Sequence, residues 1–387
     1  MTNTPLSEAD RQAAIWAWQY IQRNWQSPTG FVNSVEQYPW TTWWDQGSAI
    51  LGIHAAYQLG IISSAEFDQK ITRFLKTLET LPLPPTGLPN KFYSTNSAQM
   101  RTGSNRPDTK GGSGWSVLDM ARFLLSLHVL RTHYPRFSQP INAIVGQWRL
   151  SQLEHQGWLQ GSIPSQEGTL QLVQEGRFGY EQYAAHCLLA WGIDAFNARH
   201  SPKTKIVEVE DVLLHIDRRN LANSNGINAL TSDPYILWGL ELGWNWFTRI
   251  QAQKIVTAQQ RRYQRTNILT AVNEDAIDRS PYFIYYSVYS DGKAWNAISN
   301  EGNAYPQFRQ LSTKAAFGWA ALFPEHHYAG TLRRAVQFLA DKNKGYLAGR
   351  YENQRLGVNT LLNINTNAVI LESLLYQARS RRSLVKP

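Results

Sequence analysis

Acidic, aromatic and amide side chains are concentrated at six places where a short polar cluster leads into an apolar segment. The six clusters span residues 41–45, 114–119, 178–181, 231–235, 311–314 and 365–367. The acids within them are Asp45 and Glu181, which are candidates for catalysis, and Asp119 and Asp233, which are candidates for binding a ligand. Carboxylates and amides bind hydroxyl groups, and flat aromatic rings pack against the apolar faces of sugar rings. The clusters therefore predict a carbohydrate-binding site.

The aromatic candidates for sugar contact lie in or beside the same segments. They are Trp43, Trp44, Trp115, Tyr180, Tyr282 and Trp295. Because the chain contains 15 tryptophans and 18 tyrosines, filling a wide core is the alternative role for any single ring. For the group as a whole we favour ligand contact.

Each acid also has a structural alternative. Asp45 could act as a base, bind a hydroxyl group, or complement the dipole of the helix that it begins, and the dipole role applies equally to Glu181. Asp119 precedes Arg122 by three residues, a spacing that permits an ordinary helical ion pair. Asp233 could likewise serve the start of its helix.

Two further polar residues complete the predicted site. Lys314 lies at a helix start, where the helix dipole disfavours a cation, so we expect it to contact an acid of the site. Asn367 could reach a sugar hydroxyl, although asparagine at a helix start is also a good cap.

The apolar segments indicate the fold. Each of the six clusters opens a helix that is apolar around nearly its whole circumference and must be buried on every side. Amphipathic segments near 7–25, 67–78, 138–154, 247–265 and 327–341 bury one stripe each and are expected outside the others. The segment 205–217 alternates more like a strand. The pattern predicts an all-α (α/α)6 toroid, a double ring of helices.

Residues 266–310 are too long and too aromatic for a plain connection and contain short β-like runs. We expect a small sheet that forms a flap over the ring mouth, inserted before the fifth inner helix. Glu274 or Asp275 would then supply a second carboxyl group. The alternative is a turn that packs its own tyrosines.

Composition favours one globular domain over residues 1–387, because 43% of residues are hydrophobic, 17% are charged and no linker interrupts the alternation. Residues 380–387 are expected to be a basic, frayed tail. No run approaches the roughly 20 apolar residues that span a bilayer. No signal sequence is seen, so the sequence as numbered predicts a cytoplasmic protein, or a periplasmic or envelope-associated one if it has been trimmed.

Several partners and cofactors are not expected. The net charge is +9, yet the basic residues are scattered and no nucleic-acid motif accompanies them. Phosphate-binding and dinucleotide-binding fingerprints are absent. The single cysteine, Cys187, cannot build a thiolate zinc site, and we predict no metal site. Carboxylates and carbonyls alone could still hold a structural calcium ion.

Five motifs in one order carry a resemblance to a known family. They are Thr42-Trp43-Trp44-Asp45-Gln46-Gly47, the run 114–119, the run 174–185, the run 311–319 and Asn365-Thr366-Asn367. Together they resemble the bacterial domain-of-unknown-function family catalogued as 3131, over about residues 40–376. This family is similar to glucoamylase-like toroids, so the resemblance implies a six-by-two helical toroid.

The resemblance also implies positions for a catalytic pair. Toroidal glucosidases similar to this fold usually invert the anomeric configuration, with the acid just before the third inner helix and the base before the sixth. By that analogy, Glu175 is the leading acid and Glu352 the leading base. Such a mechanism needs one protonated and one ionised carboxyl group.

Three functions are consistent with the sequence. The first is a glycoside hydrolase on a glucan or related polysaccharide, with its carboxyl groups roughly 6.5–9.5 Å apart. The second is a non-catalytic glycan-binding or polysaccharide-assembly protein, favoured if the carboxylates prove to be paired with cations. The third is a polysaccharide lyase, which would use Tyr180, Tyr282, Arg177 and Asn367.

Overall fold

The computed structural model describes residues 5–108, 111–165, 169–200 and 203–387. The chain forms two compact units. The first comprises Met1–Gln19, Arg177–Tyr180 and Ser201–Lys386, and the second Tyr20–Gly176 and Glu181–His200. The single domain over 1–387 stays a prediction.

The second unit contains the first three predicted inner helices. Its helices are α2 (Trp43–Gln58), α3 (Ser64–Glu79), α4 (Val117–His133), α5 (Ser138–Val145), α6 (Tyr180–Leu189, whose first residue belongs to the first unit) and α7 (Phe196–His200). Two antiparallel sheets accompany them, β1 (Thr41–Thr42), β2 (Phe92–Tyr93) and β3 (Met100–Arg101), then β4 (Glu154–His155), β5 (Trp158–Pro164) and β6 (Leu170–Gln174).

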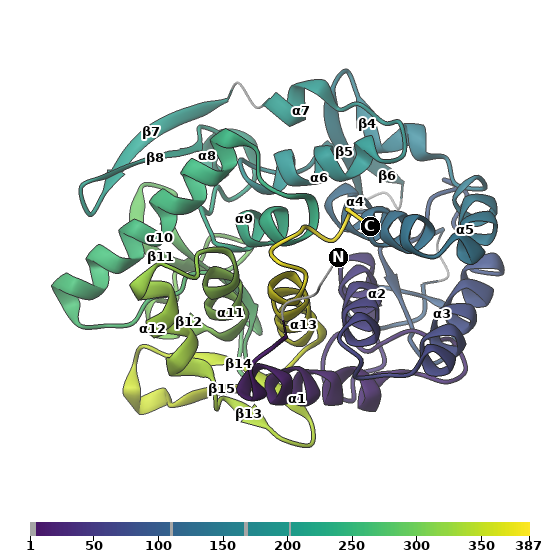
Figure 1. Ribbon diagram of the computed structural model, residues 1–387. Helices are drawn as coiled ribbons and strands as arrows, with labels where there is room; N and C mark the ends of the chain where they lie inside the picture. The colour runs from purple at the N-terminus through teal and green to yellow at the C-terminus, as the bar shows by residue number, and fades with distance from the viewer. Residues whose placement is uncertain (1–4, 109–110, 166–168, 201–202) are drawn as a thin grey trace. The chain divides into compact units, whose positions relative to one another are not determined.

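Helices α2 and α3 show the expected contrast between inner and outer helices. Every residue of α2 from Trp43 to Ala56 is buried, whereas α3 buries a stripe that includes Phe67, Phe74 and Leu78. Figure 1 shows α2 beside α4, with which it packs directly. The absence of a side chain at Gly47 permits this approach, since an added Cβ would lie 3.3 Å from the backbone nitrogen of Phe123.

The first unit contains the other three inner helices. Its helices are α1 (Glu8–Asn24, which continues into the second unit), α8 (Leu221–Ser224), α9 (Asp233–Leu237, extended by a π-helical turn Trp238–Leu242), α10 (Trp246–Thr266), α11 (Thr313–Leu322), α12 (His327–Val336) and α13 (Ile364–Ala378). Its strands are β7 (Thr204–Val209), β8 (Val212–Asp217), β9 (Glu274–Ala276), β10 (Phe283–Ser290), β11 (Lys293–Ile298), β12 (Gln310–Ser312), β13 (Ala340–Asp341), β14 (Gly345–Tyr351) and β15 (Val358–Leu362).

Helix α11 is central to the packing of this unit. It contacts α9, α12 and α13, and Figure 1 shows these helices around it. All six polar clusters therefore begin helices, as predicted. The strand-like segment 205–217 is confirmed as the β7–β8 hairpin, and 266–310 contains the predicted small sheet, in the order β11–β10–β9.

The structure corrects three expectations. Two outer helices are shorter than predicted. Helix α5 ends at Val145, and α12 ends at Val336, before residues 340–341 pair as β13 with β14. The described residues form five small antiparallel sheets, where one small sheet and one strand-like segment were expected. The tail is not frayed, because Leu384 is fully buried and its backbone N–H donates to Leu240.

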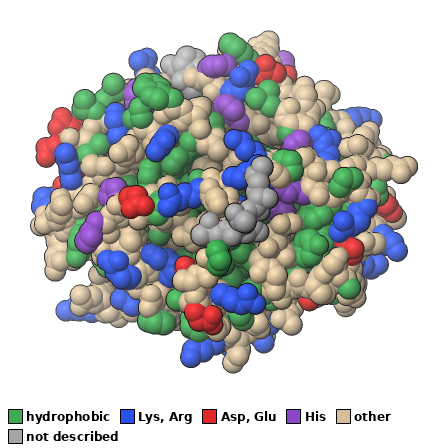
Figure 2. All heavy atoms as spheres, viewed as in Figure 1, with side chains coloured by type: hydrophobic (Ala, Val, Ile, Leu, Met, Phe, Trp, Pro, Cys, Tyr) green, Lys and Arg blue, Asp and Glu red, His purple; other side chains and the backbone are tan. Residues whose placement is uncertain are grey.

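Surface features are in keeping with the composition. On the face shown in Figure 2, lysine and arginine side chains are scattered among acidic and hydrophobic ones. Among the described residues, no helix is both long and apolar enough to cross a bilayer.

The close approach of α11 to α9 generates a stability prediction. A Cβ at Gly318 would overlap the side chain of the buried Ile236. We expect Gly318→Ala to lower the free energy of unfolding by about 1–3 kcal/mol, because overpacking outweighs the better helix propensity of alanine. Gly330→Ala in α12 is the control, since its Cβ meets only the flexible end of Arg334. Chemical denaturation of both variants checks this, and equal stabilisation by both would contradict it.

Candidate functional site

Three carboxyl groups and one lysine meet at the helix starts of the first unit. Asp233 begins α9, Lys314 is the second residue of α11, and Glu274 and Asp275 lie in β9. A parallel bridge between Ala271 and Leu311 brings the segment before β9 beside the strand that leads into α11. We call Asp233, Glu274, Asp275 and Lys314 the acid cluster.

The ammonium group of Lys314 is shared within this cluster. Its Nζ lies 3.1 Å from Asp233 Oδ1 and 3.9 Å from Asp275 Oδ1, and the three side chains are no more than 5% exposed. Asn273 Nδ2 donates to the same oxygen of Asp233 at 3.1 Å. The predicted contact of Lys314 with an acid is thus confirmed.

Other oxygens of the cluster lack partners. Among the described residues, Asp233 Oδ2 and both oxygens of Asp275 accept no hydrogen bond although they are buried. Ser312 and Gln310 lie beside Asp275, yet neither is aligned to donate to it. Buried acceptors of this kind are costly in the ionised form.

Burial raises the pKa values of two acids in the cluster, Glu274 and Asp275. Burial, and then the charge of Asp233, raise the pKa of Glu274 to about 8 against the opposing effect of Lys314. Burial likewise raises the pKa of Asp275 to about 7, with Lys314 again opposing it. Glu274 therefore retains its proton at neutral pH. It is also partly exposed, whereas Asp233 and Asp275 are buried.

Lys314 and Tyr180 respond to the same carboxylates. Burial lowers the pKa of Lys314, but Asp233, Asp275 and Glu274 outweigh it, so the pKa is raised and the lysine stays charged. Tyr180, the first residue of α6, lies beside Glu274. Burial, and then the negative charge of Glu274 once it is ionised, raise the pKa of Tyr180 well above its ordinary value.

A second group of carboxyls lies in the second unit. Glu175 accepts hydrogen bonds from Ser116 Oγ at 2.6 Å and from the Val117 N–H at 2.7 Å, at the start of α4. Asp119 is partly exposed, and burial followed by the charge of Glu175 raises its pKa to about 7. Asp45 contributes a smaller effect of the same sign. The structure therefore brings Asp45, Asp119 and Glu175 together.

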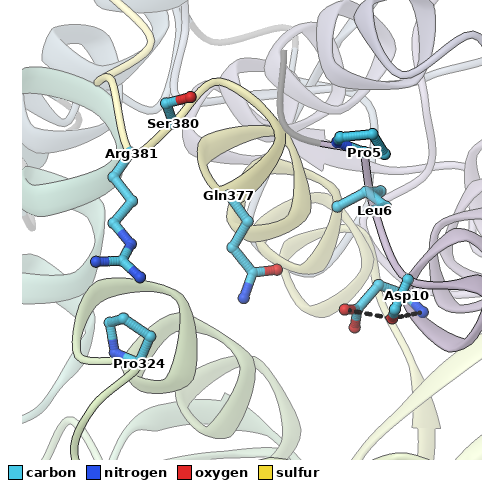
Figure 3. A pocket seen from close by; sticks show the side chains of 8 residues that line it. Pro5, Leu6, Asp10, Pro324, Gln377, Ser380 and Arg381 are labelled. Atoms are coloured by element: carbon cyan, nitrogen blue, oxygen red, sulfur yellow. Dashed lines mark hydrogen bonds between the residues drawn. The ribbon is translucent and has the colours of Figure 1, made fainter. Parts of the chain in front are cut away.

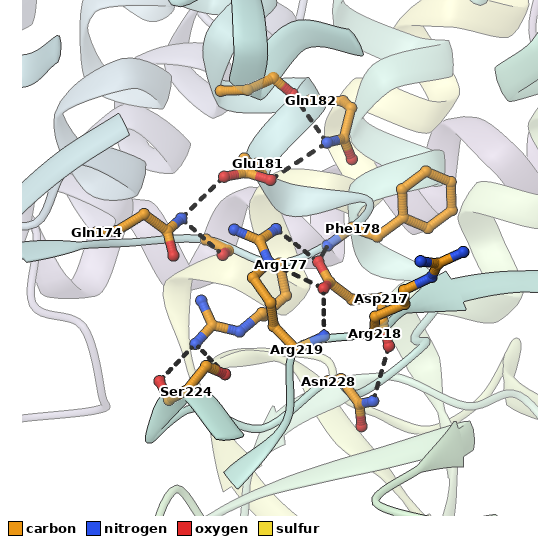
Figure 4. Close-up of polar contacts among 12 residues, drawn as sticks. Gln174, Arg177, Phe178, Glu181, Gln182, Asp217, Arg218, Arg219, Ser224 and Asn228 are labelled. Atoms are coloured by element: carbon orange, nitrogen blue, oxygen red, sulfur yellow. Dashed lines mark hydrogen bonds and ion pairs between the residues drawn. The ribbon is translucent and has the colours of Figure 1, made fainter. Parts of the chain in front are cut away.

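Asp45 and Glu181 have clear structural contacts. Asp45 forms a capping box with Thr42 at the start of α2 and also accepts from the Ser34 hydroxyl. Glu181 is fully buried and accepts from Gln174 Nε2 at 2.8 Å, which links α6 to β6 (Figure 4). These contacts favour the structural alternative for both acids.

The segment that precedes α6 is anchored in the first unit. Asp217 accepts from the Phe178 N–H at 2.8 Å and from the guanidinium group of Arg219, and Arg177 donates to Ser224 (Figure 4). Arg177 is thus engaged with Ser224, although a lyase would require it for neutralising a uronate.

Glu352 lies in a buried ion-pair network. Its two oxygens accept from Arg262 at 2.7 and 2.8 Å, from the Tyr286 hydroxyl at 2.7 Å and from Arg309 at 3.2 Å. Its side chain is 6% exposed. These contacts disfavour its predicted role as the base, because a base must have an oxygen free to orient water.

Several predicted sugar contacts are buried parts of the core. Trp43 and Trp115 are each 2% exposed, and their indole N–H groups donate to backbone carbonyls. Asn367 is fully buried. Its side-chain amide accepts a hydrogen bond from the Tyr346 N–H and donates one to the Tyr346 carbonyl. The structure does not support these three as ligand contacts.

The remaining aromatic candidates differ in exposure. Trp44 is 9% exposed and packs against Arg122, while Trp295 donates to Glu210 at 3.1 Å. Tyr282 is 67% exposed and free to meet a ligand.

The sequence analysis did not predict the contact of Asn273 with Asp233, or those of Arg262 and Arg309 with Glu352. Asn273 directly precedes Glu274, so a run of three polar residues after an apolar stretch was the available signal. Arg262 and Arg309 left no signal, because they lie 90 and 43 residues from Glu352.

A separate cavity in the first unit has a different character. It measures about 420 Å³ and is lined by Pro5, Leu6, Ser7, Asp10, Pro324, Gln377, Ser380 and Arg381 (Figure 3). It lies at the opposite ends of α11 and α13 from Lys314 and Asn367. Among the described residues that line it, the one carboxyl group, Asp10, is bound to Ser7 and Arg333, so these residues offer no acid–base pair.

The described residues contain no group of three His, Cys, Asp or Glu side chains arranged to hold a metal ion. In the acid cluster the ammonium group of Lys314 lies where a cation would balance Asp233 and Asp275.

The Glu352 network generates a second prediction. Replacing Glu352 by Gln leaves two arginines without a buried counter-charge, so we expect the free energy of unfolding to fall by about 3 kcal/mol. Asp68→Asn, which breaks the exposed pair with Arg136, is the control and should cost less than about 1 kcal/mol. Urea denaturation measures both, and a loss at Glu352 no larger than the control would refute a structural role.

Comparisons with known proteins identify the fold. An endo-beta-1,2-glucanase from Talaromyces funiculosus in complex with sophorose superposes with a TM-score of 0.67 at 11% identity, covering 98% of this chain and 85% of that chain. A proposed glucoamylase from Bacteroides caccae ATCC 43185 gives 0.66 at 12% identity, covering 98% and 97%. A D-mannose isomerase gives 0.55 at 12% identity, covering 97% and 100%.

These similarities show a mostly helical fold that is consistent with an α/α toroid, as predicted. Comparison with the curated proteins finds no match. The family model described as protein of unknown function (DUF3131) matches residues 12–380. The chain therefore belongs to the DUF3131 family, the family that its sequence motifs predicted.

Proposed function

We propose that this protein is an inverting glycoside hydrolase that acts on a glucan, with Glu274 as the proton donor and Asp233 as the ionised partner. One observation carries the proposal. Glu274 is partly exposed beside Asp233, which is paired with Lys314 at 3.1 Å, and burial raises the pKa of Glu274 to about 8. Glycosidic cleavage requires this difference between two neighbouring carboxyl groups.

The proposed chemistry uses each group once. The carboxyl group of Glu274 protonates the leaving glycosidic oxygen, and Asp233 removes a proton from the water that attacks the anomeric carbon from the opposite face. The unpartnered Oδ2 of Asp233 is the oxygen that can accept this proton. This assignment replaces the pair expected from analogy, Glu175 and Glu352, whose oxygens are engaged by α4 and by arginines.

The choice of a glucan rests on the structural relatives. One of them is described as a glucanase in complex with sophorose. Since the identity is 11%, this relative supports the proposal only through its fold. The isomerase with the same fold shows that the architecture alone does not select the reaction.

The two other functions receive less support. A pure glycan-binding protein would have all its carboxylates neutralised by cations, but Glu274 and Asp119 retain protons that can exchange near neutral pH. A lyase needs a tyrosine that readily loses its proton, and the pKa of Tyr180 is raised instead.

The proposal predicts the effect of removing either carboxyl group. We expect Glu274→Gln and Asp233→Asn each to lower kcat by roughly 10²–10⁴-fold, because each removes one proton transfer. Wild-type activity should fall as pH rises through about 8, where Glu274 loses its proton. The assay follows reducing ends and anomeric configuration on a panel of neutral and acidic glycans.

Glu208→Gln, at an exposed position of β7 in the same unit, is the matched control and should retain activity. Glu175→Gln, Glu352→Gln and Asp119→Asn should be assayed beside it, to test the remaining carboxyl candidates. Undiminished cleavage by Glu274→Gln would refute the assignment. Unsaturated products would select the lyase, and binding without turnover the glycan-binding protein.

A further inference from the structure

We propose that Lys314 and Asp275 are positioning residues that fix the charge on Asp233 and the proton on Glu274 without touching the substrate. The effect of this arrangement on catalysis rests on the hydrolase function proposed above. Lys314 is part of the site predicted from the sequence, but its side chain is 5% exposed and that of Asp275 is 1% exposed. Lys314 and Asp275 therefore act through Asp233 and Glu274, the two neighbouring carboxyl groups that the proposed reaction uses.

The position of Lys314 shows how strongly it depends on the carboxylates. As the second residue of α11, it lies at the positive end of the helix dipole, and its burial removes the stabilisation by water. Only nearby negative charge can offset both effects. The ion pair with Asp233 at 3.1 Å provides that charge.

The charges of the acid cluster do not balance if every group is ionised. Three carboxylates would face a single ammonium group, and an excess of buried negative charge is costly. The arrangement with the least net charge has Lys314 paired with an ionised Asp233, and protons on Glu274 and Asp275. Asp275 suits the neutral form, because no aligned donor meets its oxygens among the described residues.

The strand geometry separates the two protonated carboxyls. Glu274 and Asp275 are consecutive residues of β9, so their side chains point to opposite faces of the sheet. Asp275 faces Lys314, with Ser312 and Gln310 beside it, while Glu274 is partly exposed beside Tyr180. The proton on Glu274 is therefore available to a ligand, and the proton on Asp275 is held inside.

Stability as a function of pH tests the arrangement without any substrate. Asp275 has its pKa raised from 3.8 to about 7 by folding, so its contribution to stability is complete below pH about 4 and is lost as pH rises to about 7. Glu274 contributes a loss of the same sign, extending to about pH 8. Asp119 in the second unit contributes a loss of the same sign up to about pH 7. We therefore expect Asp275→Asn to remove roughly a third of the decrease in unfolding free energy between about pH 4 and 7.

The dependence of kcat/KM on pH tests the catalytic consequence. Lys314→Met removes a positive charge that favours ionisation of Glu274, so the alkaline limb of the profile should move to higher pH by on the order of one unit. Above about pH 7, where Asp275 is ionised, Asp275→Asn removes a negative charge near Glu274, so the alkaline limb should move to lower pH. Lys314→Arg keeps the positive charge and should leave the alkaline limb closer to that of the wild type.

Lys70→Met provides the matched control, because Lys70 is also buried and paired with an acid, Glu66, in the second unit. It should leave the alkaline limb in place. If Asp275→Asn keeps the full pH dependence of stability, the arrangement is refuted. An unmoved alkaline limb in Lys314→Met would refute the catalytic consequence even where hydrolysis is present. If the wild type hydrolyses no glycan but Asp275→Asn loses the slope, the proposed function fails and the charge arrangement stands.

Discussion

A lysine buried at the positive end of a helix is the constraint on which the acid cluster depends. Lys314 can remain charged there only because Asp233, and more distantly Asp275, lie beside it. The same charge limits how many neighbouring carboxyls can ionise. A single ammonium group in a buried space thus decides which acid is a carboxylate and which acids keep their protons.

The other acids of the chain are distinguished by how completely their oxygens are occupied. Glu175 and Asp45 serve the starts of α4 and α2, and Glu352 neutralises Arg262 and Arg309. These acids stabilise the fold. Glu274 is partly exposed and has a proton to donate near neutral pH, which is the property that acid catalysis requires.

The helical architecture supplies this site without specifying its reaction. The buried inner helices α9 and α11 begin at the site. Strand β9 is held beside them by its pairing with β10 and by the bridge between Ala271 and Leu311. The same fold occurs in a glucanase and in an isomerase. The chemistry must therefore be read from the side chains at the helix starts rather than from the arrangement of helices.

The sequence by itself determined the elements and their burial. Helices that are apolar all round, the strand-like 205–217 segment and the contact of Lys314 with an acid all follow from local patterns and from the helix dipole. Only the tertiary structure decided which carboxyls are free. Arg262 and Glu352 are 90 residues apart, and Asp233 and Lys314 meet through the packing of α9 on α11, so no local spacing encodes either pair. A carboxyl group acts as an acid, a base or an anchor according to its burial and neighbours, and these exist only once the chain has folded.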